Sequence, residues 1–257
     1  MRADVYLYTF GYVKSRQKAK TLIESGYVYL NGDKILKPAT ELDENLEYEI
    51  EVKDPCPYVS RGGLKLEKIL DTYSIDVSGK TAIDIGASTG GFTHCLLIYG
   101  ADKVYAIDSG TNQLDEMLLD DERVISIENY NARNICVEDI GELADIITVD
   151  VSFISQTYIL YPAARLLKDD GIYIGLIKPQ FEVGREKLGK GGIVKDKKSR
   201  LFAVNKVIDC ARSCELKCTG FIRSPIEGGD GNIEFVAIFS KNGKEINEEY
   251  IRKTVLN

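Results

Sequence analysis

A glycine-rich stretch, DIGASTGGF at residues 84–92, follows a short apolar run and contains Gly86, Gly90 and Gly91. Glycine allows the backbone to turn tightly from a strand into a helix and to approach a ligand closely. Asp108 ends the next apolar run, 22 residues after Gly86, where a carboxylate can accept hydrogen bonds from both hydroxyls of a ribose. Either feature alone would suit an ordinary strand–helix turn, but together on consecutive strands they predict a nucleoside site.

The nucleoside that suits this stretch is S-adenosylmethionine. The stretch lacks the Lys-Ser/Thr pair of a P-loop and the G-x-G-x-x-G spacing of a dinucleotide site. S-adenosylmethionine joins adenine and ribose to a charged amino-acid tail without a phosphate, so it needs no phosphate-binding lysine. We therefore expect S-adenosyl-L-methionine as the cofactor.

Charged residues stand at the ends of other apolar runs. Asp150 ends one run in TVDVSFIS, Lys178 ends the next in GIYIGLIKPQFE, and Glu234 begins a late run in NIEFVAIF. Lys65 lies earlier, in VSRGGLKLEKIL, on a segment that could fold back over the strand ends. Each residue alone would suit a salt bridge or a solvated surface, as a lysine at a strand end commonly does. Ligands of open α/β sheets bind at this edge, so other features must decide the role of these residues.

Other chemistries have less support in the sequence. The single histidine, His94, leaves no Ser-His-Asp or Cys-His arrangement unless it is the base itself. The Asp-Val-Ser-Phe at residues 150–153 differs from the Asn/Asp-Pro-Pro-Tyr/Phe of base-amino methyltransferases. Cytosine C5 methyltransferases need a cysteine near this loop, and none lies between Cys136 and Cys210.

The apolar runs alternate with helical segments from residue 79 onward. Strands are predicted at residues 81–86, 103–108, 123–128, 145–150, 171–177, 219–223 and 233–239. Helices are predicted at residues 91–99, 113–119, 154–167 and 199–212. This alternation predicts a Rossmann-like α/β fold, with a parallel sheet, helices on both faces and ligands at the carboxyl ends of the strands.

The first 52 residues predict a small α+β module. Its expected elements are helices at residues 4–13 and 15–25, a hairpin at Asn31-Gly32 and a further strand at residues 47–52. Ser15 can cap the second helix, and Gly26 follows its end. KDPCPYVS, at residues 53–60, has two prolines and no periodicity, so we expect a linker there and a second domain at residues 61–257.

This module resembles the S4 RNA-binding domain. The specific part of the resemblance is SRQKAKTLIESGYVYLNG. In that family a helix and hairpin present basic side chains to structured RNA, and Arg16 and Lys20 share one helix face here. The resemblance implies RNA contacts by Arg2, Arg16, Lys18 and Lys20. Ribosomal proteins, pseudouridine synthases and synthetases carry the module too, so it does not specify a reaction.

Composition bounds the class of protein. The 257 residues are 44% hydrophobic and 28% charged, as in folded soluble proteins, and no apolar run approaches the roughly 18–20 residues that cross a bilayer. The N-terminus shows no signal peptide, and the six cysteines are scattered without a C-x-x-C pair. We therefore expect a cytoplasmic location, no metal, and buried structural cysteines at Cys210, Cys214 and Cys218.

The charge distribution is uneven. A net charge of −7 argues against indiscriminate nucleic-acid binding. Residues 2–20 nevertheless hold five basic residues against one acidic, and residues 178–217 hold eleven against five. An acidic protein with two basic segments is typical of a selective binder of polyanions.

Lys65, Asp150, Lys178 and Glu234 occur in the order Lys-Asp-Lys-Glu, which resembles the tetrad of RrmJ/FtsJ-type ribose 2′-O-methyltransferases. A 2′-hydroxyl is a weak nucleophile, so a base must take its proton as the methyl group transfers. A lysine does this only when its pKa lies well below about 10.4. The resemblance implies that Lys178 is the base, that Lys65 is a neighbouring cation, and that the two carboxylates position them.

The resemblance extends over nearly the whole chain. An S4 module followed by YVSRGGLKLE, DIGASTGGF, DVSFIS, LIKPQFE and GGDGNIEF is similar to the TlyA (hemolysin A) family. That family uses S-adenosylmethionine to methylate cytidine 2′-hydroxyls in ribosomal RNA; the large-subunit RNA is the shared target, and some members also modify the small subunit. The cofactor residues that the resemblance implies are Gly86, Ser88, Gly90, Gly91, Phe92, Asp108 and Asn131. The linker lacks the tryptophan often found there.

Three other functions remain as alternatives at this level. A pseudouridine synthase would need a β-rich fold and no nucleoside loop, so DIGASTGGF argues against it. The hemolysin name suggests a membrane-active cytolysin, but the sequence shows no strongly amphipathic lytic helix that would support this function. The third alternative is a non-catalytic ribosome-binding protein with a methyltransferase-like fold. The intact tetrad and the intact DIGASTGGF stretch argue against it. Partners are therefore expected to be ribosomal RNA or a ribosomal subunit, with no membrane.

Overall fold

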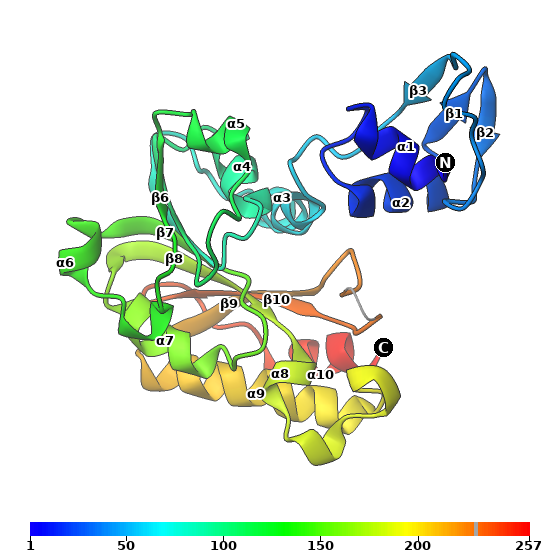
Figure 1. Cartoon of the computed structure of the whole chain (residues 1–257). Coiled ribbons are helices and arrows are strands. Elements are labelled where there is room, and N and C mark those ends of the chain that lie inside the picture. Colours follow the sequence, from blue (N-terminus) through cyan, green and yellow to red (C-terminus); the bar gives the residue numbers. More distant parts are fainter. Residues whose placement is uncertain (229–230) are drawn as a thin grey trace. The chain divides into compact units, whose positions relative to one another are not determined.

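A computed structural model describes residues 1–228 and 231–257. The chain divides into two compact units, Met1–Pro57 and Tyr58–Asn257, and Figure 1 shows the elements of each. The division falls within the segment where the sequence predicts a linker.

The smaller unit packs two helices on a three-stranded antiparallel sheet. Its elements are α1 (Ala3–Thr9), α2 (Arg16–Glu24), β1 (Val28–Leu30), β2 (Asp33–Ile35) and β3 (Ile50–Val52), with strand order β2-β1-β3. Asn31 and Gly32 have φ angles of 50° and 83°, as the predicted two-residue hairpin turn requires. Ser15 caps α2 as predicted, because its Oγ accepts a hydrogen bond from the Lys18 N–H at 3.1 Å.

The first helix is shorter than the prediction of residues 4–13. The N–H groups of Gly11 and Tyr12 donate to the carbonyls of Tyr8 and Leu7, and the φ angle of Gly11 is 76°. This is a Schellman motif, in which glycine takes the left-handed position that ends the helix. The prediction was wrong because it overlooked Gly11 as a stop signal.

The larger unit is built on one seven-stranded sheet. Its strands are β4 (Thr81–Ile85), β5 (Lys103–Ile107), β6 (Val124–Ile127), β7 (Ala144–Val149), β8 (Leu167–Ile177), β9 (Lys217–Arg223) and β10 (Phe235–Ser240), in the order β6-β5-β4-β7-β8-β10-β9. Strands β4 to β8 pair in parallel, as predicted, but β10 is antiparallel to both β8 and β9. The expectation of a parallel sheet is wrong for these two strand pairs. Parallel neighbours need a long crossover, whereas only residues 224–234 join β9 to β10.

Helices surround this sheet. They are α3 (Gly62–Tyr73), α4 (Gly91–Ile98), α5 (Glu116–Leu119), α6 (Val137–Ile140), α7 (Thr157–Ala164), α8 (Pro179–Glu182), α9 (Lys197–Ser213) and α10 (Glu248–Leu256), with short 3₁₀ turns η1 (Ala132–Asn134), η2 (Arg185–Lys187) and η3 (Lys190–Gly192). The predicted helix at residues 154–167 is too long. Leu167 already pairs with Ala144 of β7, so pairing across the sheet sets this boundary, and local periodicity does not show it.

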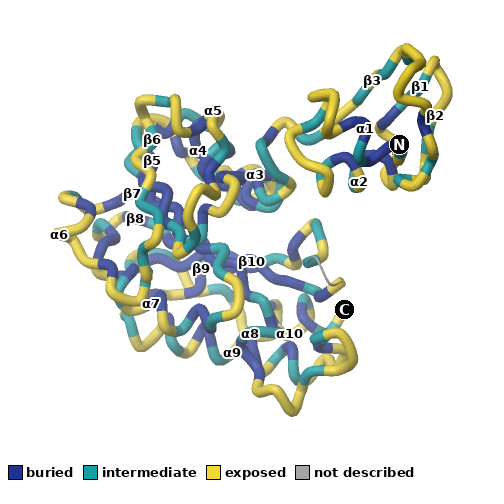
Figure 2. The backbone as a smooth tube through the Cα atoms, in the orientation of Figure 1, coloured by how far each residue is buried: buried dark blue, intermediate teal, exposed yellow. Residues whose placement is uncertain are grey.

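Buried positions gather along the strands of the larger sheet (Figure 2). Tyr173, Phe221, Phe235 and Phe239 are completely buried, and the rings of Phe221 and Phe235 stack with centroids 5.4 Å apart. A close-packed core fixes strand positions firmly. The side chains that directly follow β5, β7 and β8 are therefore held at one edge of a rigid sheet.

Candidate active site

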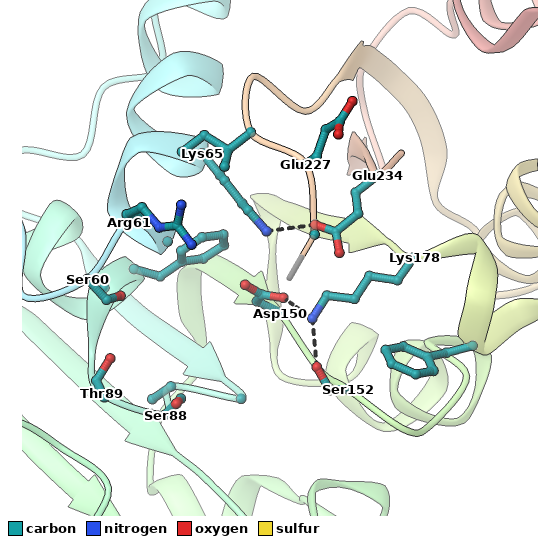
Figure 3. Close-up of a pocket in the computed structure, with 18 of the residues that line it drawn as sticks. Ser60, Arg61, Lys65, Ser88, Thr89, Asp150, Ser152, Lys178, Glu227 and Glu234 are labelled. Carbon is teal, nitrogen blue, oxygen red and sulfur yellow. Dashed lines mark hydrogen bonds and ion pairs between the residues drawn. The ribbon is translucent and has the colours of Figure 1, made fainter. Parts of the chain in front are cut away.

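A cavity of about 460 Å³ lies where the parallel strands of the larger unit end (Figure 3). Its wall includes Lys65 of α3, Asp150 after β7, Lys178 after β8 and Glu234 before β10. Lys65 and Glu234 are 169 residues apart in the sequence. The fold therefore brings all four residues of the predicted tetrad to one cavity.

The tetrad forms two ion pairs. Lys65 Nζ donates a hydrogen bond to Glu234 Oε2 at 2.6 Å, and Lys178 Nζ lies 2.7 Å from Asp150 Oδ1. Each lysine side chain is 11% exposed, against 3% for Glu234 and 20% for Asp150. Charges so far from water need partners of opposite sign. Each lysine has its own carboxylate, and both lysines face the same cavity.

The loop after β7 holds Lys178 at two points. Lys178 Nζ donates a hydrogen bond to Ser152 Oγ at 2.8 Å, in addition to its ion pair with Asp150. Within the described residues, Asp150 Oδ1 accepts no hydrogen bond of ordinary geometry, so its contact with Lys178 is electrostatic. Pro179 begins α8 directly after Lys178, and proline suits the first position of a helix because it has no N–H to leave unpaired.

Glycines allow Lys65 and Glu234 to reach the cavity. A Cβ on Gly91, at the start of α4, would lie 2.3 Å from Ser60 Oγ and 3.0 Å from the Gly63 nitrogen. The start of α3, which carries Lys65, therefore approaches α4 more closely than a larger residue would permit. A Cβ on Gly228 would lie 2.5 Å from Glu234 Oε1, so a glycine there leaves space for the Glu234 carboxylate.

A second cavity, of about 290 Å³, adjoins the first at Gly86, Ser88, Asp150, Ser152 and Phe153, which line both. Its wall is apolar at Ile107, Ile154 and Ile159, and it also includes the carboxylate-bearing Asp108. An apolar slot beside a carboxylate suits a base and its ribose.

Asp108 is held by the glycine loop, which is residues 86–91, and by the segment that follows Asp108 itself. Its Oδ2 accepts a hydrogen bond from the Ser88 N–H and its Oδ1 accepts one from the Gly110 N–H, both at 2.7 Å. Each carboxylate oxygen can accept a further hydrogen bond, which leaves capacity for the two hydroxyls of a ribose. A Cβ on Gly86, whose φ angle is 85°, would lie 2.6 Å from the Asp150 carbonyl oxygen. The residues present thus fit S-adenosylmethionine.

The predicted cofactor residues divide between the two cavities. Gly91 and Phe92 line the first, and Asp108 and Asn131 line the second. Asn131 also uses its side-chain oxygen to accept a hydrogen bond from the Arg133 N–H at 3.2 Å. Gly90 instead faces the core, where a Cβ would lie 2.2 Å from Leu118 Cδ1.

A buried carboxyl lies beneath the glycine loop. Asp84 is completely buried and accepts hydrogen bonds from the hydroxyls of Thr93, at 2.7 Å, and Thr148, at 2.8 Å. Burial raises the pKa of Asp84 to about 6, the two hydroxyls oppose that rise, and the charge of Asp150 adds to it. These bonds connect β4 to α4, the two elements that the glycine loop joins, and also to the neighbouring strand β7.

Several residues of the site were missed by sequence reasoning. The first cavity is also lined by Ser60, Arg61, Ser152, Phe153, Gln180 and Phe181. Phe153 is 92% exposed, has a φ angle of 62°, and its ring centroid lies 5.2 Å from that of Phe181. An exposed aromatic ring beside a cavity is a surface on which a nucleobase can stack. The signal was present, since Phe153 and Phe181 each lie three residues after a tetrad member.

The four predicted RNA-binding residues all lie in the smaller unit, and each has an acidic partner. Arg2 and Arg16 donate hydrogen bonds to Asp4 at 2.9 and 2.8 Å, and their side chains are 43% and 56% exposed. Lys18 pairs with Asp54 at 2.5 Å and Lys20 with Glu24 at 3.9 Å. The hydrogen bond from Arg2, helped by Arg16, lowers the pKa of Asp4 to about 2.

The cysteines carry no disulfide and are not all buried. Cys218 is buried as expected, but Cys210 and Cys214 are half-buried, so the expectation is wrong for these two. Both pack at the margin of the hydrophobic core, which leaves part of each residue near solvent. Among the described residues no cluster of three or more metal-ligating side chains occurs. In the same residues, none of the helices has both the length and the apolar composition needed to cross a bilayer.

Comparison with known families identifies both units. The FtsJ-like methyltransferase family model matches residues 58–241, and the S4 domain model matches residues 1–47. The 16S/23S rRNA (cytidine-2′-O)-methyltransferase TlyA of Mycobacterium tuberculosis is 38% identical, over 91% of this chain and 87% of its own. The 23S rRNA (cytidine-2′-O)-methyltransferase TlyA of Campylobacter jejuni is also 38% identical, over 89% of this chain and 95% of its own.

A solved structure of a hemolysin-named protein from Streptococcus thermophilus extends the similarity to the fold. It is 40% identical and superposes with a TM-score of 0.80, over 99% of this chain and 94% of that one. The similarity thus spans both units and the segment between them. The chain therefore belongs to the TlyA (hemolysin A) family of FtsJ-like methyltransferases that carry an S4 domain.

Proposed function

We propose that this protein uses S-adenosylmethionine to methylate the 2′-hydroxyl of a cytidine in ribosomal RNA. The observation that carries the proposal is that the tetrad cavity and the cavity of Asp108 share Asp150, Ser152 and Phe153. If the adenosine of the cofactor lies in the Asp108 cavity and the ribose of the RNA enters the tetrad cavity, the two would meet beside the Lys178–Asp150 pair. The two TlyA relatives are named for this reaction.

Lys178 is the candidate general base. When bound, S-adenosylmethionine supplies an electrophilic methyl group. In the proposed step the deprotonated side chain of Lys178 would take the proton of the 2′-hydroxyl as the hydroxyl oxygen bonds to that methyl group and the bond from the methyl group to the sulfur breaks. The lysine ammonium that results is the cation that pairs with Asp150. Asp150 and Ser152, at 2.7 and 2.8 Å, fix the position of the amine.

Lys65 and Glu234 form the opposite wall. Glu234 holds the Lys65 ammonium at 2.6 Å, and the pair is almost buried. A cation fixed in a largely water-excluded site stabilises the negative charge that develops on the attacking oxygen. We therefore assign Lys65 and Glu234 to charge stabilisation and Asp150 to positioning.

We propose large-subunit RNA as the principal target and small-subunit RNA as a second one. One relative is named for both RNAs and the other for 23S RNA alone, so 23S RNA is common to the two names. RNA contacts are assigned to Arg2, Arg16, Lys18 and Lys20 of the S4 unit. The basic segment at residues 178–217, which begins at Lys178 itself, is a second candidate for contact with the RNA backbone.

The test is methyl transfer from S-adenosylmethionine, labelled in its methyl group, to purified large and small ribosomal subunits that lack the modification. We expect label in a cytidine of 23S RNA, mapped as a 2′-O-methyl group, and none with the Lys178→Ala variant. A protein that binds cofactor and subunits yet transfers no methyl group would support the alternative, a non-catalytic ribosome-binding protein. Label on a base instead of a ribose would reject the tetrad assignment.

A further inference from the structure

Glu182 lies outside the cavity and joins two segments of the site, α8 and the loop after β7. It is the last residue of α8, and its side chain is 2% exposed. Its carboxylate accepts hydrogen bonds from the Gln156 N–H at 2.7 Å, the Ser155 hydroxyl at 2.5 Å and the Lys206 ammonium at 3.2 Å. Ser155 and Gln156 end the loop that begins at Asp150. A single buried carboxylate therefore connects that loop to the helix that begins just after Lys178.

The loop and α8 are thereby linked twice. The first link is in the cavity, where Lys178 contacts Asp150 and Ser152. The second is the hydrogen bonding of Glu182 to Ser155 and Gln156. Two links at opposite ends of a loop fix its conformation, and with only the first link the loop could move away from Lys178.

The loop needs such support because its backbone is strained. Residues 150–155 have no regular secondary structure, and Phe153 takes a φ angle of 62°, a region that is unfavourable for a residue with a side chain. A strained conformation persists only where its surroundings determine it. Gln156 is 1% exposed, and a Cβ on Gly175 of β8 would lie 2.4 Å from its Nε2. The end of the loop is thus packed directly on β8.

We propose that Glu182 is a positioning residue that holds Asp150 and Ser152 against Lys178. The inference rests on the proposed methyl transfer for its kinetic test. Glu182 does not touch the reacting atoms: it acts through the loop. Replacing it by glutamine keeps the size of the side chain but puts an NH₂ group where one acceptor stood and leaves Lys206 without its carboxylate.

Asp145 provides a matched control at the other end of the same strands. It belongs to β7 and accepts hydrogen bonds from a backbone N–H, that of Thr81 at 3.0 Å, and from a lysine, Lys168 at 2.9 Å. Asp145→Asn therefore removes a similar charge-assisted network far from the loop. Any effect of Glu182→Gln that comes only from lower stability should appear in Asp145→Asn as well.

The kinetic experiment compares both variants and Ser155→Ala with the wild type in methyl transfer to ribosomal RNA. We expect Glu182→Gln and Ser155→Ala to lower kcat by about 10- to 100-fold, the effect of a displacement of about 1 Å, with KM for both substrates within about twofold of the wild type. In the Lys178→Ala background, Glu182→Gln should cause no further loss, because both act through one pair. Equal loss in Glu182→Gln and Asp145→Asn, or additive loss with Lys178→Ala, would overturn the proposal.

A crystal structure of Glu182→Gln separates this inference from the proposed function. We expect the Lys178–Asp150 separation to exceed the roughly 4 Å limit of an ion pair, or the loop at residues 150–155 to take another path. An unchanged loop and ion pair would overturn the positioning role even if the enzyme methylates RNA. A displaced loop in a protein whose wild type transfers no methyl group would support the positioning role and reject the reaction.

Discussion

Asp4 of the smaller unit and Asp84 of the larger unit are both removed from water, at 2% and 0% exposure. Asp4 accepts hydrogen bonds from two arginines, and its pKa falls to about 2. Asp84 accepts hydrogen bonds from two threonine hydroxyls, and burial raises its pKa to about 6. Low exposure therefore accompanies opposite shifts: hydrogen bonds from arginines outweigh the effect of burial at Asp4, whereas burial outweighs two neutral hydroxyls at Asp84.

The two units use this difference in different ways. In the smaller unit Asp4, whose pKa is lowered, pairs with Arg2 and Arg16, whose side chains remain about half exposed, so two cations are oriented at the surface. In the larger unit the hydroxyls that hold Asp84 beneath the glycine loop are neutral, and the ammonium groups of the site pair with Asp150 and Glu234. Under the proposed function, the charges of the first unit would contact a polyanion and those of the second would serve proton transfer.

The largest expected effect comes from removing Lys178, the proposed base in the larger unit. Lys178→Ala should fold and bind cofactor and RNA, yet lose methyl transfer by about 10²–10⁴-fold, the contribution of a positioned general base. Lys178→Arg should be nearly as inactive, because arginine keeps the charge but does not give up its proton. Single-turnover methyl transfer measures both, with Lys253→Arg, at an exposed lysine, as the control. Near-normal turnover by Lys178→Arg would reduce Lys178 to an electrostatic role.

The opposite shifts of the two aspartates predict opposite dependences of stability on pH. The folded pKa of Asp84 lies above the usual 3.8, so its contribution is fully present below that pH and is lost as the pH rises through about 6, by up to about 3 kcal/mol. The folded pKa of Asp4 lies below 3.8, so its contribution is present above that pH and is lost as the pH falls toward about 2. Solvent near the exposed arginines reduces that effect to about 1–2 kcal/mol.

Asparagine variants test this contrast. As the pH rises from about 4 to about 6, the wild type should lose stability relative to Asp84→Asn, and the difference in unfolding free energy should then level off. For Asp4→Asn the difference should favour the wild type at about pH 7 and shrink below about pH 4. Hydrogen exchange in the full-length chain reports each unit separately. A flat difference for Asp84→Asn across this range would mean that its carboxyl keeps an ordinary pKa.

A smaller effect is expected from the carboxylate proposed to hold the ribose. Asp108→Ala should weaken S-adenosylmethionine binding by about 1.5–3 kcal/mol, the scale of hydrogen bonds to a charged group. Calorimetry measures the affinity, and RNA binding by the S4 unit should be unchanged. Wild-type affinity in a folded variant would remove Asp108 from the ribose site. Because Asp108 also accepts hydrogen bonds from Ser88 and Gly110, circular dichroism of the variant is the necessary control.

The sequence predicts well what depends on local pattern. Apolar runs located β5, β7 and β8, and with them the places of Asp108, Asp150 and Lys178, because a buried parallel strand needs a continuous apolar run. Contacts between distant segments leave no such pattern. The meeting of Lys65 with Glu234 followed only from family resemblance, and the link of Glu182 to Ser155 was not predicted at all.

The antiparallel placement of β10 was missed for the same reason, since strand direction depends on how the chain returns to the sheet. The sequence also does not show which charged side chains pair with one another. In the sequence Asp4 only reduces the positive charge of residues 2–20, but in the structure it orients Arg2 and Arg16. Asp4 lowers the net positive charge of this segment, yet it orients the two arginines that are proposed to bind RNA.

The smallest expected effect concerns those cations. Arg16→Ala combined with Lys20→Ala should weaken RNA binding by about 2- to 30-fold, from two exposed ion pairs worth about 0.2–1 kcal/mol each. The salt dependence of binding should also flatten, by about 0.7–0.9 in its logarithmic slope for each phosphate that the variant no longer neutralises. Lys244→Ala with Lys253→Ala removes the same charge from exposed positions of the larger unit and should leave the slope unchanged. If both double variants lower the slope equally, net charge alone accounts for the effect. If neither double variant lowers the slope, the RNA contact lies elsewhere than on α2. The proposed division, in which the smaller unit binds RNA and the larger unit transfers the methyl group, would then fail for the smaller unit.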